Sequence, residues 1–151
     1  MITTKTQEKY LELMNATEMH QASKKWYSEL SFIQDEQLFL DDLVTTYTMQ
    51  LINTKEFNDN TEIVDALNRS QKRNDELLNI VKTHTNDLEV LVDNMKQPKE
   101  EAGYKKEHQE LVKVISEFFI EYKNLKTQLF QIFKDILKNE KQIRLLDRDS
   151  K

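Results

Sequence analysis

The fold is decided by the stretch at residues 104–136, which reads YKKEHQELVKVISEFFIEYKNLKTQLFQIFKDI. Its apolar side chains recur on alternating steps of three and four residues, which places them on one face of an α-helix. The positions in phase are Tyr104, His108, Leu111, Ile115, Phe118, Tyr122, Leu125, Leu129, Ile132 and Ile136, and Ile143 continues the pattern. A repeat of about 3.5 residues kept this long predicts a helix that buries a continuous seam against its neighbours, with left-handed supercoiling.

Two earlier stretches keep the same rhythm. The first comprises Met19, Ser23, Trp26, Leu30, Ile33, Gln37, Leu40, Val44, Tyr47 and Leu51, and the second comprises Ile63, Leu67, Ser70, Asn74, Leu77, Val81, His84, Leu88, Leu91 and Met95. The chain has one Gly and one Pro, whereas folds rich in strands need turn residues far more often. We therefore predict an all-α fold, an up-down-up bundle of three long heptad-patterned helices, since short connections make successive helices antiparallel.

The breaks in the pattern give the helix boundaries. Residues 53–60 are rich in Asn, Asp and Thr, which favour turns and caps. Pro98 suits the first turn of a helix and cannot stand in its interior. We therefore expect the long helices at about residues 18–53, 61–96 and 99–146, within a single helical-bundle domain over residues 1–151.

The N-terminal residues are out of phase with the first seam. Tyr10, Leu11 and Met14 are apolar, and Asn15 followed by Glu18 resembles a capping box. This pattern predicts a short helix at about residues 4–14 and a turn near Asn15. One continuous helix from about residue 5 to residue 52 is the alternative.

Composition and charge exclude several classes of protein. The formal net charge is −5, with 22 basic and 27 acidic side chains, so binding to nucleic acid is not expected. The longest apolar runs are three residues, so we expect no membrane-spanning segment. There is no Cys, which excludes disulfides and thiol chemistry, and the first residues lack the apolar core of a signal peptide. A cytoplasmic location is therefore expected.

Several seam positions are polar, and they define a predicted polar core of Gln37, Asn74, His84 and Tyr122. If the helices fold back at the two breaks, Gln37 lies level with Leu77 and Tyr122, and Gln37 could bond to Tyr122. Because a buried polar group without a partner is costly, such residues are expected to bond across the bundle and to fix its register. The alternative function is a ligand-binding, four-helix-like bundle with these residues in a polar pocket.

The chain offers no arrangement typical of a metal site or an active site. The residues three before His20, His84 and His108 are not Glu, so the Glu-x-x-His pairs of di-iron bundles are absent. We therefore expect no cofactor, no metal site, no catalytic residues and no enzymatic activity.

A second apolar stripe beside the seam is the most informative feature. It comprises Phe32, Phe39 and Leu43 on the first long helix and Phe119, Phe130, Phe133 and Leu137 on the third, together with Val112. These positions face each other when two parallel helices lie side by side, so they predict an apolar groove. An acidic face of Asp35, Glu36, Asp41 and Asp42 lies next to it and could steer a basic partner.

Apolar grooves are normally covered. A second copy of the chain could cover this one as a homodimer, another protein's amphipathic helix could dock in it, or the N-terminal segment could fold over it. The sequence therefore predicts a small structural or protein-interaction module.

Overall fold

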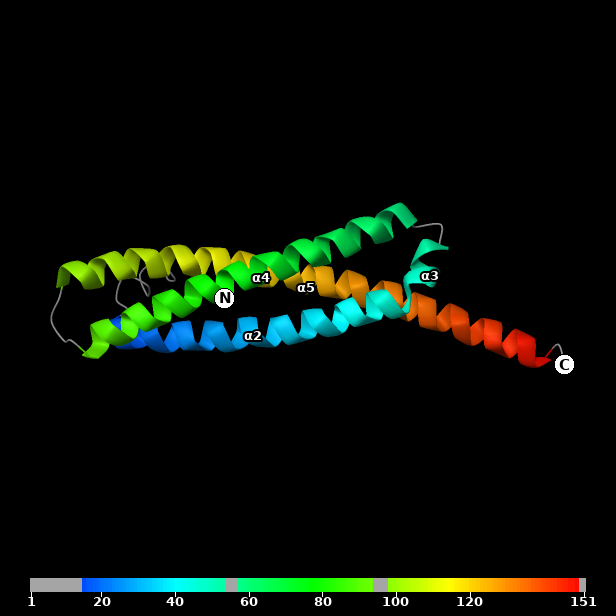
Figure 1. Ribbon diagram of the computed structural model, residues 1–151, viewed down its shortest axis with the longest axis horizontal. Coiled ribbons are helices and arrows are strands. Elements are labelled where there is room, and N and C mark those ends of the chain that lie inside the picture. Colours follow the sequence, from blue (N-terminus) through cyan, green and yellow to red (C-terminus); the bar gives the residue numbers. More distant parts are fainter. Residues whose placement is uncertain (1–14, 54–56, 94–97, 150–151) are drawn as a thin grey trace, which may run out of the picture. The chain divides into compact units, whose positions relative to one another are not determined.

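The computed structural model of the protein describes residues 15–53, 57–93 and 98–149, all in helices or in the residues that connect them. Figure 1 shows the four helices of this part: α2 at Ala16–Thr46, α3 at Thr48–Ile52, α4 at Phe57–Asp93 and α5 at Pro98–Asp149. The predicted all-α bundle of three long helices is confirmed, while the helix expected at 4–14 lies outside the described residues. None of these four helices has an apolar stretch long enough to cross a bilayer.

The chain divides into two compact units, each built from segments of all three long helices. Unit 1 comprises Met1–Gln34 and Arg73–Phe119, and unit 2 comprises Asp35–Lys72 and Ile120–Lys151. The boundary therefore falls inside α2, α4 and α5. The expectation of a single domain over residues 1–151 remains a prediction.

Two helix starts follow from the sequence as expected. The Asn15 side-chain oxygen accepts a hydrogen bond of 2.9 Å from the backbone N–H of Glu18, which caps α2. One helix running through Asn15 from residue 5 is therefore wrong. The third long helix begins at Pro98, where the missing N–H costs nothing.

The first long helix does not run unbroken to residue 53. It ends at Thr46, Tyr47 has the dihedral angles φ −105° and ψ 23°, and α3 begins at Thr48. Near this break the hydroxyls of Thr45, Thr46 and Thr48 each bond to a backbone oxygen four residues back. Such bonds bend helices, which gives a physical reason for the break that apolar periodicity does not reveal. The next helix begins at Phe57, earlier than expected.

The seams form the core. Every described position of the three seams is buried or half-buried except Ile143. In unit 1, Met19 of α2 packs with Leu88 and Leu91 of α4, and Tyr104 of α5 packs against this cluster. The 3.5-residue rhythm therefore identifies the buried faces correctly.

The axial register differs from the expected one. Gln37 bonds to Ser70, which lies one heptad before the predicted neighbour Leu77. His84 of α4 contacts His108 of α5, whereas the predicted register places Ile115 opposite His84. The α4–α5 register is therefore also shifted by one heptad. A stripe that repeats every seven residues cannot tell one heptad from the next. The two one-heptad shifts cancel when α2 is compared with α5. Tyr122 therefore lies level with Gln37 as predicted, and its hydroxyl donates a hydrogen bond to Glu36.

Gly103 allows a test of helix α5. It lies within the helical segment and is exposed to solvent, and a Cβ added at this position would meet no neighbouring atom within 4 Å. Because Gly weakens a helix relative to Ala, we expect Gly103→Ala to raise the free energy of unfolding by about 0.5–1 kcal/mol. Urea unfolding followed by circular dichroism measures this. The reverse change at the exposed neighbour, Ala102→Gly, should lower stability by a similar amount, and equal stability of Gly103→Ala and wild type would contradict an ordered helix there.

Candidate functional site

The α2–α5 side of unit 2 is held by two cross-helix contacts. Glu36 accepts a hydrogen bond of 2.6 Å from the Tyr122 hydroxyl and lies 3.0 Å from the Lys126 ammonium. Further along the chain, the rings of Tyr47, the residue that follows α2, and Phe133 of α5 have centroids 6.1 Å apart. Since the contacts occur in the same order along both segments, α2 and α5 run parallel here.

Three apolar side chains lie between these contacts. Phe39 is about one helical turn after Glu36, and Phe130 is one turn after Lys126. Their side chains are 55% and 44% exposed, and Leu43 is half-buried. Phe39, Leu43 and Phe130 form the central part of the stripe that predicts a groove from sequence, and we therefore call them the α2–α5 groove.

The other predicted partner-binding residues lie in different environments. Phe133 is 4% exposed and belongs to the core beneath the groove, so it cannot serve as an exposed anchor. Leu137, one turn further along α5, is exposed. Phe32 and Phe119 belong to unit 1, where Phe32 is exposed and Phe119 is half-buried against Phe118. Only the unit 2 residues can therefore be assigned to one surface.

The acidic face is smaller than the sequence suggests. Glu36 is engaged by Tyr122 and Lys126 within unit 2. Asp35 and Asp42 are exposed, and Asp41 is half-buried. Asp35 and Asp42 lie one turn before and one turn after Phe39, so they flank its ring along the helix. The groove therefore presents an aromatic residue between two carboxylates.

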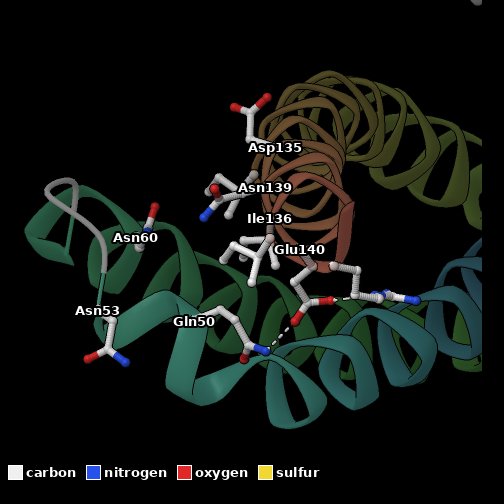
Figure 2. A pocket seen from close by; sticks show the side chains of 10 residues that line it. Gln50, Asn53, Asn60, Asp135, Ile136, Asn139 and Glu140 are labelled. Carbon is white, nitrogen blue, oxygen red and sulfur yellow. Dashed lines mark hydrogen bonds and ion pairs between the residues drawn. The ribbon is translucent and has the colours of Figure 1, made fainter. Parts of the chain in front are cut away.

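A cleft that the sequence did not predict lies elsewhere in unit 2, where α5 passes α3 and the start of α4 (Figure 2). It has a volume of about 870 Å³, and its lining residues are Gln50, Asn53, Asn60, Ile132, Asp135, Ile136, Asn139, Glu140, Ile143 and Arg144. Gln50 donates a hydrogen bond of 2.5 Å to Glu140, and Arg144 lies 3.9 Å from the same carboxylate. The one sequence signal for this cleft was that the apolar repeat of the third stretch continues to Ile143.

The predicted polar core is not one pocket. Gln37 and Tyr122 lie in unit 2, whereas Asn74 and His84 lie in unit 1. Gln37 donates to the Ser70 hydroxyl at 3.0 Å, and Asn74 donates to the Leu30 carbonyl at 3.0 Å. Burial, and next the hydrogen bond to Glu36, raise the pKa of Tyr122, which is therefore a neutral donor at physiological pH. These bonds join neighbouring helices and favour a role in fixing register.

Unit 1 buries a pair of histidines. His84 Nε2 and His108 Nδ1 are 3.0 Å apart, and the His108 ring stacks on Trp26 with centroids 4.5 Å apart. The Glu107 carboxylate lies 3.3 Å from His84 Nδ1 and so favours a proton on that nitrogen. His84 Nε2 then accepts from His108 Nδ1, and His108 Nε2 is left without a hydrogen-bond partner among the described residues.

Both histidines resist protonation. Burial and then the charge of His84 lower the pKa of His108 to about 4. Burial also lowers the pKa of His84, although the carboxylates of Glu107 and Asp87 act in the opposite direction. Both rings are therefore neutral near pH 7 and behave as core residues.

Within residues 15–53, 57–93 and 98–149, no group of three or more His, Asp or Glu side chains could hold a metal ion. A scan of protein-family models finds none that matches this chain, and searches of curated proteins and of solved structures find no match either. The function therefore has to be argued from the surface of the protein itself.

The register role of the polar core is testable at Asn74. Its side-chain oxygen has no partner among the described residues, and a buried orphan costs about 1–3 kcal/mol. We expect Asn74→Leu to raise the melting temperature by several degrees while the chain stays uniquely folded. The control is Asn68→Leu at an exposed position of α4, which should change it little. A lower melting temperature for Asn74→Leu would contradict this account.

The histidine pair predicts acid sensitivity. Between pH 6.5 and 4 the unfolded chain binds a proton at His108 and the folded chain does not, so stability is complete above this window and falls as the pH drops through it. The loss is on the order of 3 kcal/mol by pH 4. Urea unfolding at successive pH values measures it, and the fluorescence of Trp26, the single Trp, reports on unit 1.

The matched variants are His108→Gln and His20→Gln. His108→Gln removes the titrating group and should make stability less dependent on pH in this window. His20 is only half-buried on α2, and its replacement should leave the dependence unchanged. The same pH dependence in His108→Gln and wild type would show that His108 is not the source.

Proposed function

We propose that this protein is a small structural module that acts by protein–protein association, with the α2–α5 groove of unit 2 as its binding surface. The observation that carries the proposal is that two exposed rings, Phe39 on α2 and Phe130 on α5, lie along their helices between the Glu36–Lys126 and Tyr47–Phe133 contacts. The partner is an amphipathic helix, because a groove between two parallel helices accepts a third helix along its length.

The distribution of exposed apolar residues supports unit 2 as the binding part. The two units have similar numbers of described residues, yet ten of the fourteen exposed large apolar side chains lie in unit 2. The four in unit 1 are Tyr27, Phe32, Ile80 and Val90. Concentrated apolar exposure is typical of association surfaces.

The two aromatic rings of the groove can supply much of the binding free energy. Fully burying a Phe side chain is worth about 1.5–3 kcal/mol, so the two rings together can dominate an interface of modest size. The adjacent carboxylates of Asp35 and Asp42 favour a partner helix with basic residues beside its apolar stripe. A small-molecule pocket in the polar core is less well supported, because its residues already bond to other side chains or to the backbone.

The test compares wild type with Phe130→Asp at tens of micromolar by light scattering and by fluorescence of a hydrophobic dye. We expect wild type either to self-associate or, as a monomer, to bind the dye through the groove. Phe130→Asp should lose either property, because it replaces one of the two exposed rings with a charge. A wild-type monomer that binds no dye would overturn the proposal.

The control is Ile80→Asp, which changes an exposed apolar residue of α4 in unit 1. It should behave as wild type in both measurements. Far-ultraviolet circular dichroism must show the same helix content in all three proteins, so that a lost interaction is not confused with unfolding. Equal losses in Ile80→Asp and Phe130→Asp would place the association elsewhere.

A further inference from the structure

We infer that the helix which fills the α2–α5 groove is the C-terminal end of α5, residues 137–147, from a second copy of the chain. The groove and the α5 end would then be covered reciprocally in a two-fold symmetric dimer. This inference rests on the proposed function and adds the identity of the partner and its orientation.

The end of α5 carries apolar side chains that the core leaves exposed. Among the residues whose burial the structure describes, Ile136 is the last buried one of α5, and every side chain from Lys141 to Asp147 is exposed. Leu137, Leu145 and Leu146 are among the exposed large apolar residues. The α5 segment of unit 2 continues for about 45 Å, whereas the α4 segment of this unit spans only about 24 Å. An exposed apolar helix of this kind is stabilised when another surface covers it.

The α5 end and the groove have opposite charges beside their apolar residues. On α2, Phe39 stands between Asp35 and Asp42. On α5, Leu137, Lys141, Arg144 and Leu145 line one hollow on the helix surface, where Arg144 lies 3.9 Å from Glu140 and Lys141 is exposed. The ammonium of Lys141, beside Leu137 and Leu145, is therefore complementary to the carboxylates beside Phe39. This complementarity favours a second copy over an unrelated partner.

The axial positions are compatible with a two-fold axis at the level of Ile136. Glu36 lies level with a point midway between Tyr122 and Lys126, so Phe39, three residues further along α2, lies about level with Thr127 on α5. If two α5 helices cross antiparallel at the level of Ile136, Leu145 of the second copy also falls level with Thr127 and therefore meets Phe39. Lys141 of the second copy then falls level with Gln131, near Asp42.

Symmetry doubles the contact. Each copy contributes one groove and one α5 end, and the same contact forms twice in an isologous dimer. A stable interface buries about 800 Å² on each partner, which a helix end of about 16 Å cannot supply alone. The groove, the α5 end and the α5–α5 crossing beside Leu137 together make the larger surface. The helix end cannot fill its own groove, because α5 continues unbroken to Asp149.

Disulfide trapping tests the geometry directly, since the chain has no native Cys. We expect Leu137→Cys to form a disulfide-linked dimer under mild oxidation, because position 137 of each copy lies next to the two-fold axis. Mixing Phe39→Cys with Leu145→Cys should give the mixed disulfide in preference to either homodimer. Val90→Cys, exposed on α4 of unit 1, is the control and should remain monomeric. Equal trapping at positions 90 and 137 would overturn the inference.

Charge exchange tests the orientation. We expect Lys141→Glu to weaken the dimer about five- to tenfold in sedimentation equilibrium, because two carboxylates then face each other. The double variant Asp42→Lys with Lys141→Glu should recover most of the affinity. Leu145→Asp should weaken the dimer about a hundredfold or more. Helix content is compared in every variant by circular dichroism.

The failures of the two proposals are distinguishable. If Phe130→Asp abolishes association but Leu145→Asp and Lys141→Glu do not, the groove is the binding surface and the α5 end is not its occupant. If wild type is a monomer that binds dye through the groove, the second copy is likewise excluded as the occupant. If neither association nor dye binding occurs, both proposals fail.

Discussion

The structure depends on the burial of one apolar stripe from each of three long helices. Buried Leu and Ile side chains such as Leu30, Leu77 and Leu129 supply most of the driving force, since each is worth about 1.5–3 kcal/mol when removed from water. The same burial constrains everything placed in the stripe. Asn74 and His84 lie at fully buried positions, so their hydrogen bonds determine which heptads of neighbouring helices meet.

The exposed apolar surface consists of flank residues that the core does not bury. A three-helix core needs the seam and part of one flank, and Phe133 is recruited into it beside Tyr47. Phe39 and Phe130 lie on the same flanks but remain exposed. The Glu36–Lys126 pair lies one turn earlier and joins α2 to α5 there. The exposed apolar surface of unit 2 is therefore a consequence of which flank residues its core buries.

Sequence reasoning succeeded where one periodicity decides the outcome. It predicted the all-α bundle, the cap at Asn15 and the start of α5 at Pro98, because these depend on local pattern and local hydrogen bonds. It missed the break at Tyr47, where several Thr hydroxyls bond to the preceding turn. It also placed Phe133 on the surface, since a flank position can be buried or exposed without any change in the pattern.

The sequence by itself determined which face of each helix is buried, because an amphipathic helix can remove its apolar stripe from water in only one orientation. Tertiary structure alone decided the register, bringing Gln37 to Ser70 and His84 to His108. It also decided which aromatic residues stay accessible. The physical reason is the same for both: a heptad pattern is unchanged by a shift of seven residues, whereas hydrogen bonds, ring contacts and ion pairs form in only one of the shifted arrangements.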